Sequence, residues 1–173
     1  MTRPDRVIPL AKVTEGLRLL DANIRAFVTD SQALLSEGHD SHAIALAIYA
    51  FEELGKYSEL QRLQEEATKK EATTIVVKDE LFQLHPYKQD IAKKLLPEES
   101  MILMPAYFDE RYFSPKYFWT RTVSVKPSLR SECTFVDWID DDWRIGIGTT
   151  CDAARLRKFL TSVQEALDRL EKT

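Results

Sequence analysis

Two carboxylates and a lysine lie within five positions of one another in the middle of the chain, at Glu52, Glu53 and Lys56. Glu52 precedes Lys56 by four residues and Glu53 precedes it by three, so on a helix either carboxylate can pair with the ammonium group. An exposed pair of this kind contributes only about 0.3–0.5 kcal/mol to stability. At the edge of a buried helix the same residues would form a polar site, and the spacing leaves both interpretations open.

A histidine and a second lysine, His85 and Lys88, form the other candidate group, on either side of Pro86. Pro86 lacks a backbone donor, clashes with the carbonyl of Phe82 and disfavours helical geometry at His85, which predicts a kink or a new helix start. The kink would present His85 beside a freed carbonyl, with Lys88 on the next turn. His85 could take part in acid–base chemistry there, or form hydrogen bonds that only support the structure.

The element that carries Glu52, Glu53 and Lys56 should be the central helix. Apolar positions between residues 43 and 57 cover more than half of the helix circumference, which is typical of a helix touched by two or more neighbours. They are Ala43, Ile44, Leu46, Ala47, Ile48, Ala50, Phe51, Leu54 and Tyr57. Gly55 costs about 1 kcal/mol of helix propensity relative to alanine, so we expect a packing or site reason for it.

The neighbouring segments predict the rest of an antiparallel bundle. Residues 9–37 form a long amphipathic pattern that ends at Gly38, and the short linker 38–41 turns the second helix back, with Asp40 or Ser41 as its N-cap. The second helix should run to about residue 70, followed by a brief extended link at 73–77. Two short strands at 133–139 and 143–147 precede a last helix at about 150–172, capped by Thr149 or Thr150. The predicted fold class is therefore mainly α, an antiparallel helical bundle with a small β-hairpin before the last helix.

The length, charge and apolar content of the chain limit the classes of protein to which it can belong. A chain of 173 residues fits one domain, 1–173, that buries about 70% of its unfolded surface. A net charge of −4 argues against nucleic-acid binding through overall basicity, and we expect no DNA partner. No apolar run approaches the ~20 residues needed to cross a bilayer, and the first residues do not resemble a signal peptide, so a cytoplasmic location without membrane association is predicted.

No cofactor or metal site is predicted. Cys133 and Cys151 lack metal-ligand spacing and are expected to be free thiols. His39 and His42 lie at the turn between the first two helices without facing carboxylate–histidine pairs, so a di-metal bundle site of the ferritin kind is not supported and surface or capping roles are favoured.

An irregular, aromatic-rich segment spans about residues 97–132. Basic residues alternate with aromatic rings there, including Arg111, Lys116, Trp119 and Arg121. Positive charge beside stacking surfaces is what a single-stranded RNA groove requires, so these four residues are candidate RNA or partner contacts. The alternative is a flap that buries its rings against the bundle or across a homodimer interface.

Three stretches together resemble the AbiV family of abortive-infection proteins, a branch of the HEPN helical superfamily. They are AIALAIYAFEELGK at 43–56, HPYK at 85–88 and RSECTFVDWIDDDWR at 130–144. The resemblance implies a phage-defence protein that halts growth of the infected cell through a protein or RNA partner. It also implies that Glu52, Glu53, Gly55, Lys56, His85 and Lys88 form one polar cluster where the kinked third helix crosses the second, with Lys56 paired to a carboxylate.

Many HEPN proteins are metal-independent ribonucleases with an Arg-x(4–6)-His motif. This chain departs from that pattern, since Lys78, Asp79 and Glu80 stand at those positions before His85 and no arginine does. The departure favours binding over catalysis. If the protein is an enzyme, the resemblance implies an endoribonuclease with His85 as base and Lys56, Lys88 or Lys78 for phosphate charge. The third alternative is a non-enzymatic dimeric interaction module.

Overall fold

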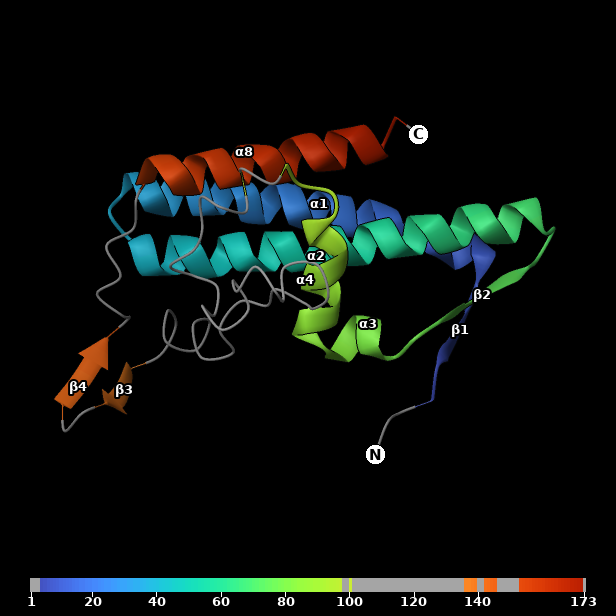
Figure 1. Cartoon of the computed structure of the whole chain (residues 1–173), viewed down its shortest axis with the longest axis horizontal. Coiled ribbons are helices and arrows are strands. Elements are labelled where there is room, and N and C mark those ends of the chain that lie inside the picture. Colours follow the sequence, from blue (N-terminus) through green and yellow to red (C-terminus); the bar gives the residue numbers. More distant parts are fainter. Residues whose placement is uncertain (1–3, 98–99, 101–135, 140–141, 146–152, 173) are drawn as a thin grey trace, which may run out of the picture.

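The computed structural model describes residues 4–97, 100, 136–139, 142–145 and 153–172. Two long antiparallel helices, α1 (Leu10–Ser36) and α2 (Asp40–Lys69), form a hairpin, and α8 (Ala153–Leu170) packs along both of them. The short helices α3 (Glu80–Gln83) and α4 (His85–Lys93) follow, and α4 crosses α2 near its middle (Figure 1). The predicted mainly α bundle is confirmed, and none of the described helices is apolar enough over its length to cross a membrane.

The turn between α1 and α2 follows from one glycine. Gly38 adopts a φ of +78°, and the backbone N–H of His39 donates to the carbonyl oxygen of Leu34 at 2.8 Å, the pattern of a Schellman cap. The prediction that Asp40 or Ser41 caps α2 is wrong. His39 occupies the N-cap without a side-chain hydrogen bond, because the Schellman turn ends at His39 and α2 starts immediately after it.

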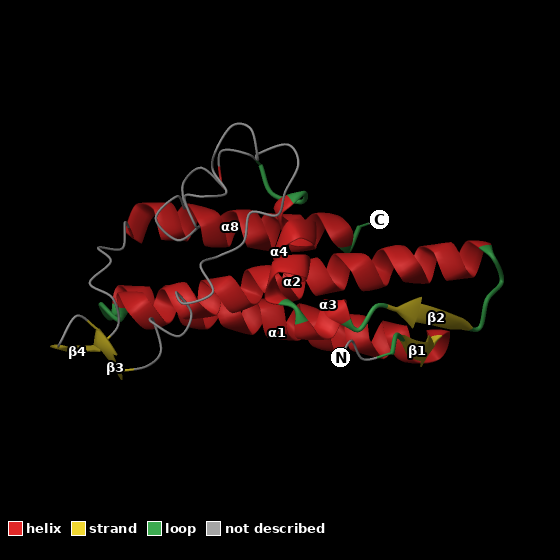
Figure 2. Ribbon diagram, turned by 60° about the horizontal axis from the view of Figure 1, so that its bottom comes forward, coloured by secondary structure: helices red, strands yellow, loops and turns green. Residues whose placement is uncertain are grey.

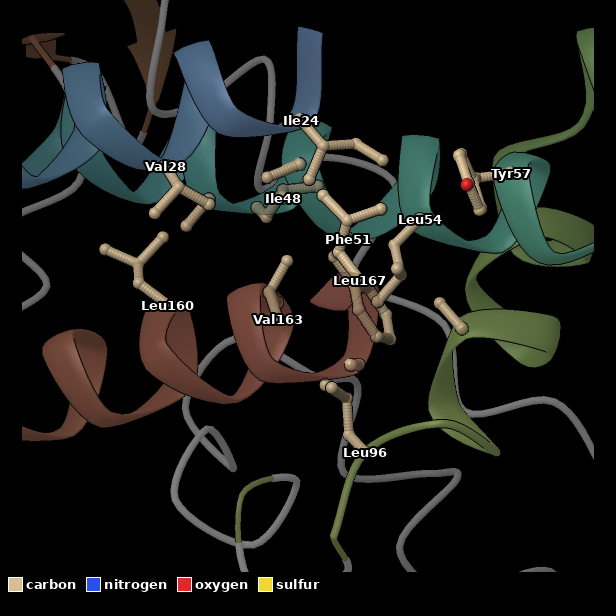
Figure 3. Packing of buried hydrophobic residues seen from close by; sticks show 14 of the residues in the cluster. Ile24, Val28, Ile48, Phe51, Leu54, Tyr57, Leu96, Leu160, Val163 and Leu167 are labelled. Carbon is tan, nitrogen blue, oxygen red and sulfur yellow. The ribbon is translucent and has the colours of Figure 1, made fainter. Parts of the chain in front are cut away.

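The hydrophobic core lies around α2, as its apolar arc predicts. Fully buried side chains of α2 meet those of α1 and α8 (Figure 3). The rings of Phe51 and Phe159 pack with their centroids 5.5 Å apart. The largest side chains in this core are Phe51, Phe159, Ile24, Ile44, Leu54, Leu81, Leu156, Leu160 and Leu167. This packed core supports the polar residues of α2 and α4.

Among the described residues, two small antiparallel sheets accompany the helices (Figure 2). Strand β2 (Thr74–Val77) is the predicted extended link, and it pairs with β1 (Arg6–Pro9), a strand that the sequence did not reveal. Strands β3 (Val136–Ile139) and β4 (Asp142–Ile145) form the hairpin predicted before the last helix. The remaining predicted strand positions, 133–135 and 146–147, lie outside the described residues.

The break at Pro86 is also confirmed. Leu84 is extended, with φ −100° and ψ 112°, and separates α3 from α4, which has Pro86 in its first turn. Several other predicted features lie outside the described residues, namely the caps Thr149 and Thr150, the two cysteines, and the candidate contacts Arg111, Lys116, Trp119 and Arg121.

Candidate functional site

The centre of the site is the carboxylate of Glu52 on α2. The residue is only 3% exposed, although it carries a charge at neutral pH in its ordinary form. A buried carboxylate needs hydrogen-bond donors or opposite charges around it, because removing it from water is costly. All the donors that we find for Glu52 within the described residues come from α4.

Three side chains of α4 surround this carboxylate. The Nδ1 atom of His85 lies 2.6 Å from Oε2, and the Nζ atom of Lys88 lies 3.3 Å from the same oxygen. Gln89 donates from Nε2 to Oε1 at 2.7 Å. Residues 85, 88 and 89 are spaced three and four apart and therefore lie on one face of α4. Both oxygens of Glu52 are thus held by a single helix face.

Gly55 explains how α4 comes so close to α2. A Cβ atom built on Gly55 would lie 2.0 Å from the backbone oxygen of Lys88 and 3.2 Å from the backbone nitrogen of Ala92. Only glycine therefore fits at this position with α4 where it is. Gly55 follows Glu52 by three residues on α2, so the helix contact and the buried carboxylate lie on the same side of that helix.

Glu53 and Lys56 form a separate ion pair. Their Nζ and Oε1 atoms are 2.6 Å apart, and both side chains are less than one-fifth exposed, at 16% for Glu53 and 17% for Lys56. Lys56 is therefore paired with the carboxylate three positions before it, while Glu52, four positions before it, faces α4 instead. The structure brings Glu52, His85 and Lys88 together and places Glu53 with Lys56 in a pair beside them.

The sequence analysis did not identify Gln89. Its spacing of four residues from His85 would place it on the same helix face, which is the one signal that could have indicated it.

Lys78, considered for phosphate binding, is exposed in the link between β2 and α3. Burial and the nearby carboxylate of Glu59 raise the pKa of Tyr87, and the positive charge of Lys78 acts in the opposite direction.

The hydrogen bonds determine what the site can do chemically. An ionised carboxylate can only accept hydrogen bonds, so the short contact with Glu52 requires the proton of the imidazole to be on Nδ1 of His85. The side chain of Glu52 is 4% exposed, whereas that of His85 is 42% exposed. The charge is therefore buried at the α2 end of the contact, and the imidazole reaches the surface at the other end. Lys88, whose side chain is 6% exposed, neutralises Glu52.

A separate groove lies at the N-terminal end of α2. It is an apolar groove of ≈ 400 Å³ lined by Leu34, His39, His42, Ala45, Leu46 and Tyr49. Across the part of the chain that the structure describes, no group of three or more histidine, cysteine or acidic residues could hold a metal ion. Among the ion pairs of the described residues, that between Glu52 and Lys88 at the α2–α4 crossing is the most buried.

These features define a helical-bundle protein in which a short helix, starting at a proline break, donates a histidine, a lysine and a glutamine to a buried glutamate of the central helix. The HEPN_AbiV family model, described as AbiV, matches residues 12–145. The chain therefore belongs to the AbiV family of the HEPN superfamily, whose name indicates abortive-infection phage defence. Searches of curated proteins and of solved structures gave no match.

Proposed function

We propose that this protein halts growth of a phage-infected cell by binding a protein or RNA partner at the surface where α4 meets α2, with His85 as a contact residue. Family membership supports the phage-defence role. The observation that carries the site is the buried Glu52 carboxylate, which holds the imidazole of a partly exposed histidine at 2.6 Å.

A purely structural contact between two helices does not need such a group. Replacing a buried ion pair by well-packed apolar residues is often neutral or stabilising by about 1–4 kcal/mol. Glu52 and Lys88 are both at least nine-tenths buried, at 3% and 5% exposure, so their desolvation opposes folding. Their presence is explained if they hold His85 in one orientation and one tautomer for recognition at the surface.

The surrounding charges favour binding over phosphate chemistry. Lys88 contacts Glu52, and Lys56 contacts Glu53, so either ammonium group would have to leave a carboxylate before it could stabilise a phosphate. This exchange is most costly for Lys88, because both Lys88 and Glu52 are buried. The imidazole of His85, by contrast, is 42% exposed and accessible to a partner.

The test is a phage challenge of cells that carry wild-type protein, His85→Ala, Glu52→Gln or Glu53→Gln. We expect His85→Ala and Glu52→Gln to lose protection, because one removes the contact and the other the negative charge that holds it. Glu53→Gln is the matched control, since it alters the adjacent carboxylate, which pairs with Lys56. Circular dichroism of each purified variant separates lost recognition from lost folding. Full protection by folded His85→Ala would refute the proposed site.

A metal-independent ribonuclease is the second candidate, favoured by one observation. A carboxylate hydrogen-bonded to Nδ1 is the arrangement that orients a histidine for general acid–base work at Nε2. Incubation of total cellular RNA and tRNA with purified protein in a chelator tests it. Cleavage by the wild type that disappears in folded His85→Ala would establish the enzyme, and intact RNA in both samples would leave binding as the function.

A further inference from the structure

The apolar groove at the N-terminal end of α2 follows the junction between two helices. On the α2 side it is lined by His39, His42, Leu46 and Tyr49. These residues are spaced three or four apart, so they lie along one side of the helix. From the first to the last of them α2 rises about 15 Å, close to three turns. Leu34 lines the groove from α1.

Acidic residues flank the α1 side of this groove. Asp30 precedes Leu34 by four residues and Glu37 follows it by three, so both lie on the face of α1 that carries Leu34. Both are exposed. They are separated along α1 by two turns, about 10.5 Å. Neither lysine nor arginine occurs between residues 26 and 55, so the α1–α2 hairpin presents only negative side-chain charge beside Leu34.

The basic side chains of α8 do not neutralise this face. Arg157 reaches the same end of α1, where its Nη2 lies 3.5 Å from the hydroxyl oxygen of Ser36. Ser36 is two residues from Leu34 and therefore about 200° around the helix. The positive charge of Arg157 lies on another side of α1 than the groove.

These features define the chemistry of the occupant. An apolar groove between two helices accepts the apolar face of a third helix, whose anchors recur every three or four residues. Two carboxylates that are two turns apart favour lysine or arginine at the same spacing on that helix. Nucleic acid is disfavoured, because its binding depends on lysine and arginine beside the phosphates.

We infer that this groove is the docking surface for a basic, amphipathic helix of a partner protein. The apolar face of that helix packs against Leu34, Leu46 and Tyr49, and its lysine or arginine side chains pair with Asp30 and Glu37.

The groove adjoins the proposed binding surface at the α2–α4 crossing. Tyr49 precedes Glu52 by three residues, less than one turn of α2, and Glu52 holds the imidazole of His85. A helix in the groove would therefore end beside His85. The inference rests on the proposed function in that one partner meets both surfaces, and it identifies this partner as a protein rather than an RNA.

Two synthetic peptides of about 14 residues, long enough to span the groove as helices, test the inference. Both carry leucine on one helix face, and the rest of the sequence is lysine in one peptide and glutamate in the other. Fluorescence anisotropy with the full chain should show at least about tenfold tighter binding of the lysine peptide. Added salt should reduce this preference, because the charges involved are exposed.

Matched variants locate the binding site. Asp30→Lys should weaken binding of the lysine peptide about fivefold, whereas Glu165→Lys, which makes the same charge change at an exposed position of α8, should not. Leu46→Gln should weaken it about tenfold. Leu19→Gln is the control for that change, since Leu19 is 54% exposed on α1 and does not line the groove. Circular dichroism verifies the fold of each variant, and Asp30→Lys decides if Leu46→Gln does not fold.

Three results would overturn the inference. They are equal binding of the two peptides, unchanged binding of the lysine peptide by folded Asp30→Lys, and displacement of that peptide by a single-stranded RNA oligonucleotide. The last result would assign the surface to RNA. Each leaves the proposed function standing, because the peptides report on the groove whereas the phage challenge of His85→Ala reports on the α2–α4 crossing.

Discussion

Replacing Gly55 by alanine should destabilise the protein, although alanine is the better helix former. The added Cβ would lie 2.0 Å from the backbone oxygen of Lys88, whereas ordinary contacts begin at 3.4 Å. This oxygen belongs to the backbone, so α4 as a whole must move. The movement pulls His85 and Gln89 away from the buried carboxylate of Glu52.

The expected change in the free energy of unfolding combines two losses with one gain. Overpacking a close contact typically costs about 1–3 kcal/mol, and loss of hydrogen bonds to a charged group adds about 1.5–3 kcal/mol for each bond. The gain in helix propensity recovers about 1 kcal/mol. With one of these two bonds lost, the net loss is about 1.5–5 kcal/mol, which in a chain of this size corresponds to a decrease in Tm of about 3–20 °C.

Gly16→Ala supplies the control. Gly16 lies inside α1, and a Cβ built on it meets nothing within 4 Å. This substitution should stabilise the protein by about 0.4–1 kcal/mol, because alanine has the higher helix propensity and reduces the conformational entropy of the unfolded chain, while no contact is disturbed. Urea denaturation of both variants measures the two changes in the free energy of unfolding. If Gly55→Ala is as stable as Gly16→Ala, the close approach of α4 to α2 is wrong.

Two further predictions concern charge and pH. Glu52→Ala should lower the free energy of unfolding by about 3–5 kcal/mol, because it leaves Lys88 buried without its partner. Lys56→Ala, which breaks a pair nearer the surface, should lower it by about 1 kcal/mol or less. Urea denaturation measures both changes, and equal losses would contradict this distinction. Burial, followed by the negative charge of Glu171, raises the pKa of Tyr57 above 10.0. Tyr57 therefore contributes stability that is complete below pH 10.0 and is lost as pH rises through the higher folded-state pKa. As the pH rises above 10.0, the Tm of Tyr57→Phe should therefore fall less steeply than that of the wild type, and identical pH profiles of Tm would contradict this.

The sequence predicted those features that depend on one segment alone. The wide apolar arc between residues 43 and 57 identified α2 as the central helix, and Pro86 identified the break before α4. Both follow from local geometry, namely the 100° turn per residue of a helix and the missing donor of proline. The propensity cost of Gly55 likewise predicted a packing reason, which the backbone of Lys88 supplies.

Features that depend on two distant segments were not accessible in the same way. Spacing alone allowed Lys56 to pair with either Glu52 or Glu53. Because α4 packs on the side of α2 that carries Glu52, Glu52 binds residues of α4 and Lys56 pairs with Glu53. Strand β1 was missed because its four residues are stabilised by pairing with β2, almost 70 positions further along the chain. The error at the start of α2 arose because the Schellman turn leaves no linker residue for a side-chain cap.

The spacing of Glu52 and Gly55 links packing to chemistry in this protein. Three residues apart on one helix, they face the same stretch of α4, so the glycine sets how closely α4 approaches and the glutamate accepts the donors that the approach delivers. A larger residue at position 55 would lengthen the 2.6 Å contact between Glu52 and His85 even with every polar residue intact. Glu53 and Lys56 lie on the neighbouring side and satisfy each other, which leaves Glu52 to α4. The Glu-Glu-x-Gly-Lys sequence therefore specifies a helix crossing as well as a set of charges.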